Sequence, residues 1–159
     1  MRFIFSFTFF LFLIFTVNAQ TSVKTKHGLI FAIGNYPTKK TGWDSLSSNN
    51  DIPLIKKTLL NQGFDNKNIN VVADEAATLA GIKNAFSELI KKAKSGDIVV
   101  IHFSSHGQQV EADEQSKSID GMDECIVTYN AMNPKKWDKK DYDFLVAEYL
   151  RGHVIGDFL

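Results

Sequence analysis

Two imidazoles and two hydroxyls near the middle of the sequence could do acid–base or nucleophilic chemistry: His102, Ser104, Ser105 and His106. An imidazole has an unperturbed pKa of about 6.5, so it can act as a general base or acid near neutral pH. The two serines are too close to His106 in sequence to be presented easily to its ring, and no Gly-x-Ser-x-Gly motif surrounds them. His106 is therefore the first catalytic candidate, and it needs a nucleophile from elsewhere.

A shared metal ion is the alternative role for His102 and His106. In a strand, a rise of about 3.3 Å per residue would separate them by about 13 Å, which is too far for one zinc ion. His102 is then a structural residue on a sheet face. The single cysteine, Cys125, begins an apolar run, and this pattern favours a small buried side chain over a nucleophile.

The element that must position His106 is the apolar run 98–103, which predicts a strand buried on both faces. Apolar runs at 29–33 and 69–72 predict two earlier strands. Two helices alternate with them, one opened by Asp51 as an N-cap and stopped by Gly63, the other capped by Thr78. This β-α-β-α-β order predicts an α/β domain with a parallel sheet, in which residues beyond the carboxyl ends of strands face a ligand crevice.

Less regular sequence follows His106. Residues 108–118 are polar, an acidic turn leads into a predicted strand at 125–127, and residues 149–159 resemble the start of a helix. The pattern contains no Gly-x-Gly-x-x-Gly motif, no Walker loop and no EF-hand spacing. The sequence up to this point indicates a fold more strongly than a function.

The first nineteen residues have the pattern of a secretory signal peptide: one cation, Arg2, an apolar run, and small-residue cleavage chemistry before Gln20. An uncleaved anchor is the alternative, although the run is short for a membrane span of about 20 residues. We expect a polar lead at 20–26, one domain at 27–159, a secreted or periplasmic location, and no membrane contact after cleavage. Residues 20–159 carry one more acidic than basic residue, so no global charge favours nucleic acid.

The sequence resembles the caspase-like cysteine peptidases, of the metacaspase type, in four motifs: HGLIFAIGNYP, SSNND before a helix, DIVVIHFSSHGQQ and DGMDECIVTYN. Their order and spacing resemble the amino-terminal, large-subunit portion of that family over residues 26–159. The resemblance implies a three-layer caspase-like (caspase-haemoglobinase) fold, with a mostly parallel sheet flanked by helices and truncated at its C-terminus.

The resemblance also implies a function and a site. The activity is cysteine-type endopeptidase cleavage of a peptide or protein substrate by a Cys-His dyad. His106 matches the general base and acid, and Gly107 matches the residue whose backbone N–H binds the oxyanion. Asp51 and Ser104 match positions lining the pocket for the residue before the cut bond, where a carboxylate favours Arg or Lys.

The family's cysteine follows a further helix and strand, so the resemblance implies that these 159 residues are an incomplete catalytic domain, inactive alone. The alternative is a non-catalytic caspase-like binding module, a pseudopeptidase that keeps the fold. Ser105 stands where metacaspases usually have glycine.

Calcium is a separate question. Asp123 matches a calcium-binding aspartate of metacaspases, but Gly152 and His153 replace an acidic pair in the family's Leu-Arg-Asp-Asp segment. Ca²⁺ needs several hard oxygen ligands. We therefore expect no cofactor, with calcium at Asp123 as the alternative.

Overall fold

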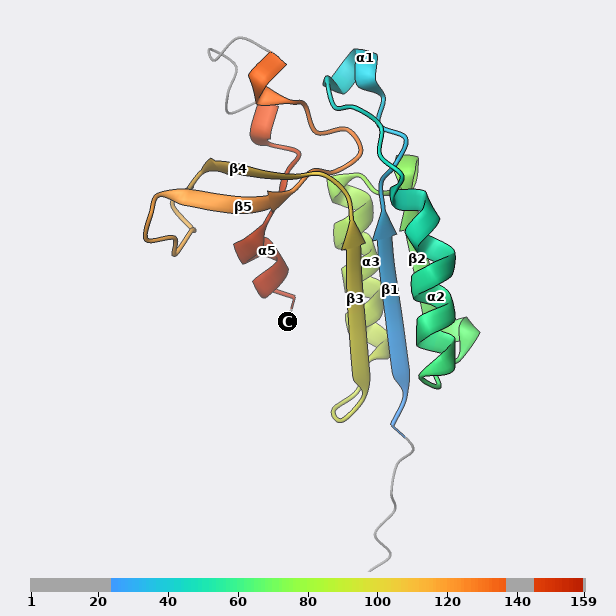
Figure 1. The fold of residues 1–159 in the computed structure, drawn as a ribbon. Helices are drawn as coiled ribbons and strands as arrows, with labels where there is room; N and C mark the ends of the chain where they lie inside the picture. The colour runs from blue at the N-terminus through green and yellow to red at the C-terminus, as the bar shows by residue number, and fades with distance from the viewer. Residues whose placement is uncertain (1–23, 137–144, 159) are drawn as a thin grey trace, which may run out of the picture.

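A computed structural model describes residues 24–136 and 145–158, which form a parallel sheet and a smaller antiparallel sheet beside it (Figure 1). The parallel sheet contains β1 (Lys26–Ala32), β2 (Ile69–Ala73) and β3 (Ile98–Ser104) in the order β2-β1-β3. The strands predicted at 29–33, 69–72 and 98–103 are confirmed, as is the parallel α/β arrangement. The signal peptide predicted for residues 1–19 lies outside the described residues and stays a prediction.

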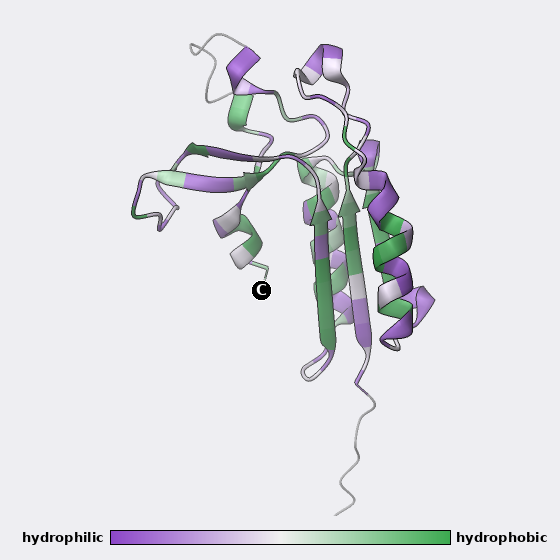
Figure 2. Cartoon of the chain, viewed as in Figure 1, coloured by the Kyte–Doolittle hydropathy of each residue, from purple (hydrophilic) through white to green (hydrophobic). Residues whose placement is uncertain are grey.

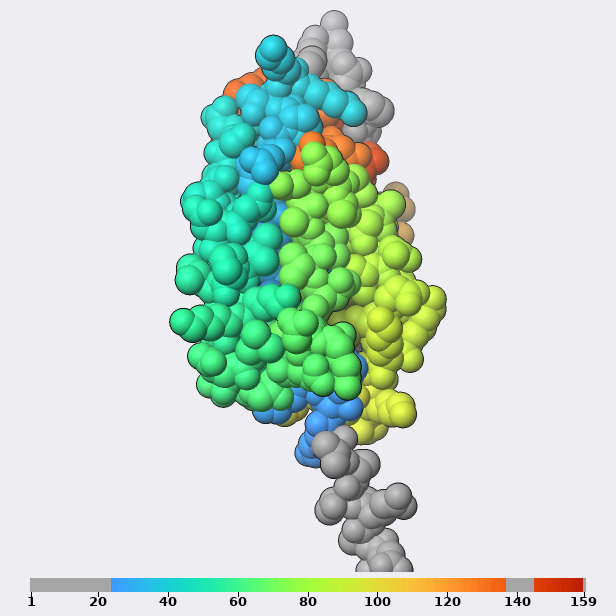
Figure 3. All heavy atoms as spheres, turned by 90° about the vertical axis from the view of Figure 1, so that its right-hand side faces the viewer, coloured from blue at the N-terminus to red at the C-terminus, as the bar shows by residue number. Residues whose placement is uncertain are grey.

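Two helices cover opposite faces of the parallel sheet. Successive side chains of a strand point to opposite faces, and Leu29 and Phe31 of β1 accordingly pack with Phe86 of α3 (Leu79–Lys92), whereas Ile30 packs with Leu59 of α2 (Asp51–Asn61). Much of β1 and β3 is hydrophobic (Figure 2), and from the side of β2 only small parts of β1 are visible between the surrounding elements (Figure 3). These three layers, helix on sheet on helix, are the predicted fold class.

Two details of the elements predicted around the parallel sheet are wrong. β3 is not buried on both faces, because it forms an edge of the described sheet; Ile98 and Val99 are 43% and 39% exposed. Asp51 begins α2 but is not its N-cap, since the short 3-10 helix η1 (Ser48–Asn50) runs directly into α2 and places Asn50 at the cap position. The cap predicted at Thr78 is confirmed, because its hydroxyl accepts from the Gly81 N–H at 3.1 Å.

The second sheet follows β3 directly and has the order β4-β5-β6. Its strands are β4 (Gly107–Glu111), β5 (Met122–Ile126) and β6 (Leu150–Arg151), all antiparallel. Two residues of the strand predicted at 125–127 form the end of β5, and Val127 lies just beyond it, while β4 lies in a stretch that the sequence shows only as polar. The helix predicted at 149–159 is wrong in its start, because residues 150–151 join β5 as β6 and only α5 (Gly152–Gly156) is helical.

The remaining described elements are short. They are α1 (Thr38–Thr41), η2 (Asn66–Asn68), η3 (Asp74–Ala76) and η4 (Pro134–Lys136). No helix among the described residues is both long and apolar enough to cross a membrane.

Candidate active site

His106 lies just beyond the carboxyl end of β3, where its ring is enclosed by the loop that follows β1. The ring centroid of His106 is 4.9 Å from that of Trp43 and 5.2 Å from that of Tyr36, both buried. The ring nitrogen Nε2 lies 2.8 Å from the backbone carbonyl oxygen of Asp44. Two aromatic side chains and one carbonyl therefore fix the plane of the imidazole.

The contact with Asp44 selects one form of the neutral imidazole. A carbonyl oxygen only accepts hydrogen bonds, so Nε2 must carry the proton. The other nitrogen, Nδ1, then keeps its lone pair and is the atom that can accept a proton. This is the orientation that a general base requires, with the second nitrogen held by a fixed acceptor.

Tyr36 links the two sheets beside His106. Its hydroxyl donates to the Val127 carbonyl at 2.8 Å and accepts from the His106 backbone N–H at 3.3 Å. The Val127 N–H in turn donates to the His106 carbonyl at 3.0 Å. The Tyr36 hydroxyl thus stands between the His106 N–H and the Val127 carbonyl, which would bond directly in a regular antiparallel pair. Burial raises the pKa of Tyr36 above its ordinary value, although the His106 hydrogen bond acts against it, and the hydroxyl stays protonated.

Gly107 opens β4 and is exposed. In an antiparallel pair, hydrogen-bonded and non-hydrogen-bonded residue pairs alternate. Since His106 and Val127 form a hydrogen-bonded pair, Gly107 and Ile126 form the next, non-hydrogen-bonded one. The Gly107 N–H therefore points away from β5, on an exposed backbone next to the imidazole.

Asp51 and Ser104 meet at the same edge of the parallel sheet. Ser104 is the last residue of β3 and Asp51 the first of α2, and the Ser104 hydroxyl donates to the Asp51 carboxylate. The structure thus brings together the two residues predicted to bind a basic side chain, and Ser104 is two residues before His106 in the chain. Both side chains are partly buried.

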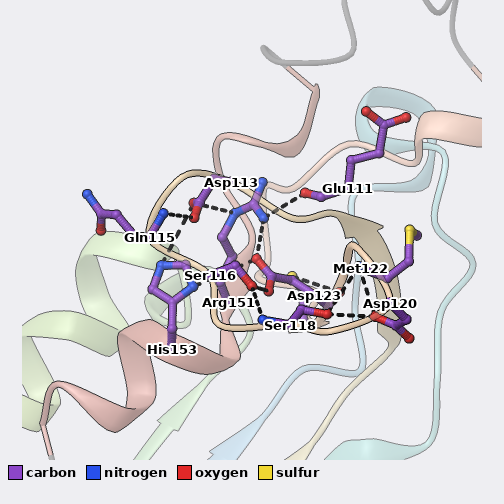
Figure 4. A network of polar contacts seen from close by, with 11 residues as sticks. Glu111, Asp113, Gln115, Ser116, Ser118, Asp120, Met122, Asp123, Arg151 and His153 are labelled. Carbon is purple, nitrogen blue, oxygen red and sulfur yellow. Dashed lines mark hydrogen bonds and ion pairs between the residues drawn. The ribbon is translucent and has the colours of Figure 1, made fainter.

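Asp123 lies apart from this group, as the second residue of β5 and three residue pairs along the β4–β5 ladder from Gly107. It is buried, and its carboxylate accepts from the Ser116 hydroxyl and from the Arg151 guanidinium, whose Nη1 lies 2.6 Å away (Figure 4). The Ser116 hydrogen bond and Arg151 hold the pKa of Asp123 below its ordinary value despite burial. The carboxylate is therefore charged and already paired.

A cluster of potential metal ligands surrounds Asp123. Asp113, Asp123 and His153 each offer one ligand atom, and these atoms lie within 4.8 Å of one another. Arg151 enters the same cluster, since its Nε lies 3.4 Å from Asp113 while its Nη1 contacts Asp123. Ca²⁺ takes six to eight oxygen ligands, and a guanidinium beside two carboxylates repels a second cation. These residues do not fit a calcium ion.

Cys125, the single cysteine of the sequence, is buried in the core. Its Sγ lies 3.7 Å from the Asp123 carbonyl oxygen, and burial raises the pKa of its thiol to about 11. A thiol in this state remains protonated and unreactive at neutral pH. The predicted role as a small buried residue is the one that its surroundings support.

Comparison with known proteins decides the family. The caspase domain, a peptidase family, matches residues 25–153 of the sequence. The chain belongs to the caspase domain family. Members of this family are cysteine peptidases, which hydrolyse proteins or peptides, so the predicted family and fold are confirmed.

Among its relatives the chain is similar to plant metacaspases. Metacaspase-7 of Arabidopsis thaliana is 36% identical over 133 residues, covering 80% of this chain and 32% of the relative. Metacaspase-4 of the same plant is 35% identical over 109 residues, covering 65% of this chain and 25% of the relative. The chain thus spans about a third or less of the length of these two metacaspases.

A solved structure supports the caspase-like fold. The protein GSU0716 from Geobacter sulfurreducens superimposes with a TM-score of 0.61 at 20% sequence identity, over 85% of this chain and 44% of that protein. At this identity the likeness concerns the fold alone.

Sequence reasoning did not identify the residues that hold His106 in place. Trp43 and Asp44 lie in the loop between β1 and α2, where no sequence motif marks either residue as functional. Asp44 contributes a backbone carbonyl, which no residue type could reveal. Tyr36 lies within the HGLIFAIGNYP motif, where its residue type does not indicate a contact with His106.

Proposed function

We propose that this protein is part of a cysteine endopeptidase in which His106 activates a catalytic thiol. Support comes from the contact between His106 Nε2 and the Asp44 carbonyl, because it leaves Nδ1 as the proton acceptor. Nδ1 takes the thiol proton as the thiolate attacks the carbonyl carbon of the substrate, and later gives that proton to the leaving amine. Water then hydrolyses the thioester.

The Gly107 N–H is the proposed oxyanion donor. Its direction away from β5 leaves it available to the negative oxygen of a tetrahedral intermediate, and a donor of this kind acts without reorganisation during the reaction. Having no Cβ, Gly107 also lets a substrate backbone approach; among the described residues, a Cβ placed there would meet only the Cys125 carbonyl, at 3.8 Å.

The proposed specificity is for Arg or Lys before the cut bond. The Asp51 carboxylate is oriented by the Ser104 hydroxyl at the edge of the sheet that carries His106. A partly buried carboxylate pairs with a guanidinium or ammonium, and a neutral side chain would leave it unpaired.

The nucleophile is proposed to come from sequence beyond Leu159, because Cys125 is buried and its thiol pKa is raised to about 11. These 159 residues should then be inactive alone. The experiment compares this chain with the full-length protein on peptides carrying Arg, Lys or Asp before the scissile bond. We expect the longer protein to cleave the Arg and Lys peptides and this chain to cleave none. A full-length protein that cleaves no peptide would instead favour a non-catalytic binding module.

We also propose that this domain uses no calcium at Asp123, because the Arg151 guanidinium supplies the positive charge between Asp123 and Asp113. The side chain of Asp123 is 8% exposed and that of Arg151 is 15% exposed, so the pair is shielded from water. Removing one partner of a buried ion pair leaves an uncompensated charge and costs roughly 3 kcal/mol of folding free energy.

Arg151→Gln should therefore destabilise the chain by roughly 3 kcal/mol in denaturant unfolding, and added Ca²⁺ should stabilise this variant but not the wild type. Lys67→Gln is the matched control, since Lys67 pairs with Asp65 on the surface with side chains 77% and 53% exposed. We expect its midpoint of denaturant unfolding to stay close to that of the wild type, because an exposed ion pair contributes little to stability. A wild-type chain that is stabilised by Ca²⁺, with the effect lost in Asp123→Asn, would contradict the proposal.

A further inference from the structure

Asp74 has an unusual backbone for its residue type. It follows β2 directly and has a φ of 43°, in the left-handed region that residues other than glycine rarely adopt. Such a conformation persists only where surrounding contacts hold it, and these positions gather near functional sites. The contacts that hold Asp74 in this conformation therefore bear on the neighbouring candidate site.

The Asp74 carboxylate accepts four hydrogen bonds from the two ends of one loop. One oxygen accepts from the backbone N–H groups of Gly34 and Asn35, each at 2.9 Å. The other accepts from the side-chain amides of Asn35 and Asn49, each at 2.8 Å. Burial would raise the pKa of Asp74, but these hydrogen bonds hold it below its ordinary value. The group is therefore a charged acceptor at neutral pH.

The two ends that Asp74 joins belong to the loop that encloses His106. Gly34 and Asn35 lead into Tyr36, whose hydroxyl contacts the His106 backbone, and Asn49 lies two residues before Asp51. Between the two ends lies Asp44, the acceptor for His106 Nε2.

Contacts between Gly34 and Leu46 also hold the beginning of the loop against its later part. The Leu46 N–H donates to the Gly34 carbonyl at 2.8 Å, and a Cβ on Gly34 would come within 2.9 Å of the Leu46 carbonyl oxygen. Gly34 is thus packed directly against the segment that carries Asp44. A shift at Gly34 must move that segment.

We propose that Asp74 is a positioning residue that holds both ends of the loop 34–49 and so keeps the Asp44 carbonyl on His106 Nε2. It touches neither the imidazole nor a substrate, and acts through Gly34, Asn35 and Asn49. Its significance for catalysis rests on the proposed function, but the contact itself does not.

The test measures the hydrogen bond of the imidazole directly. In the chain labelled with ¹⁵N-histidine, NMR follows the exchange with solvent of the His106 Nε2 proton. Asp74→Asn keeps the side-chain size but replaces one acceptor oxygen with a donor, which cannot accept from the two amides. We expect exchange about tenfold faster, since a hydrogen bond of typical net strength is being opened.

Asp65→Asn is the matched control. Asp65 lies at the other end of β2, where its carboxylate accepts from the Lys67 N–H at 3.1 Å, remote from the loop 34–49. It should lose some stability without any change in the exchange of the His106 proton. An Asp74→Asn variant that loses stability but keeps wild-type exchange at His106 would show a purely structural role and overturn the proposal.

Asn49→Ala covers the case in which Asp74→Asn does not fold. It removes one of the four hydrogen bonds and leaves the carboxylate in place. We expect exchange about threefold faster, and unchanged exchange would also overturn the proposal. Neither measurement needs a thiol or a peptide, so a failure of the proposed peptidase activity would leave this result intact.

Discussion

Changing His106 to alanine in the full-length protein should lower kcat/KM for an Arg peptide roughly ten-thousand-fold, the scale of loss when a member of a catalytic dyad or triad is removed. The variant lacks the base for the thiol and the acid for the leaving amine. The substrate contact proposed for Asp51 is unchanged in this variant, so the loss should appear in kcat and leave KM nearly constant. Steady-state kinetics on one fluorogenic Arg peptide measures both constants.

His102→Gln is the control for this prediction. His102 lies within β3, the strand that ends just before His106, and not in the loop beyond it. We expect kcat/KM within about threefold of the wild type, because this variant removes no group that the mechanism uses. Cleavage by His106→Ala at the rate of His102→Gln would refute the assignment of the general base.

Asp51→Asn should lower kcat/KM for Arg and Lys peptides about a thousandfold, because a shielded cation would lose its charged partner, an effect of roughly 4 kcal/mol. The amide keeps the shape of the side chain and can still accept from the Ser104 hydroxyl. The preference over a neutral peptide, such as one with Gln before the cut bond, should fall by a similar factor. A panel of peptides differing only at that residue measures the change.

Asp44→Asn is the control for Asp51→Asn, because it removes a negative charge near His106 but outside the proposed binding pocket. The Asp44 side chain is 82% exposed, and His106 contacts only its backbone carbonyl, which the variant keeps. We expect little change in either rate or preference. Specificity that survives Asp51→Asn would show that another group reads the basic residue.

The sequence predicted the parallel sheet because its signals are local. The apolar runs of β1, β2 and β3 and the Thr78 cap each depend on a few neighbouring residues. The position of His106 at a strand end follows from the same pattern. The exposure of β3 could not be predicted, because it depends on which strand lies at the edge of the sheet.

The second sheet and the surroundings of His106 depend on contacts between distant residues. β4 is polar and becomes a strand only through pairing with β5. Arg151 contacts Asp123 because β6 pairs with β5, and no local sequence pattern predicts this pairing. Asp74 could have been suspected by the rule that led to His106, since both follow the carboxyl end of a strand of one sheet.

The bridge made by the Tyr36 hydroxyl bears on the order of folding. It joins residues 70 and 91 positions apart, and the Asp44 contact with His106 spans 62. Contacts between such distant residues form late and slow the folding of a domain, because closing long loops costs chain entropy before the contacts compensate for it. On emergence from the ribosome, a chain that has made β1 and α2 still lacks the imidazole. We therefore expect the Asp44 carbonyl to hold the His106 proton at Nε2 only when the last long-range contacts have formed. In a partly folded chain the imidazole is then not yet oriented for the proposed role as a general base.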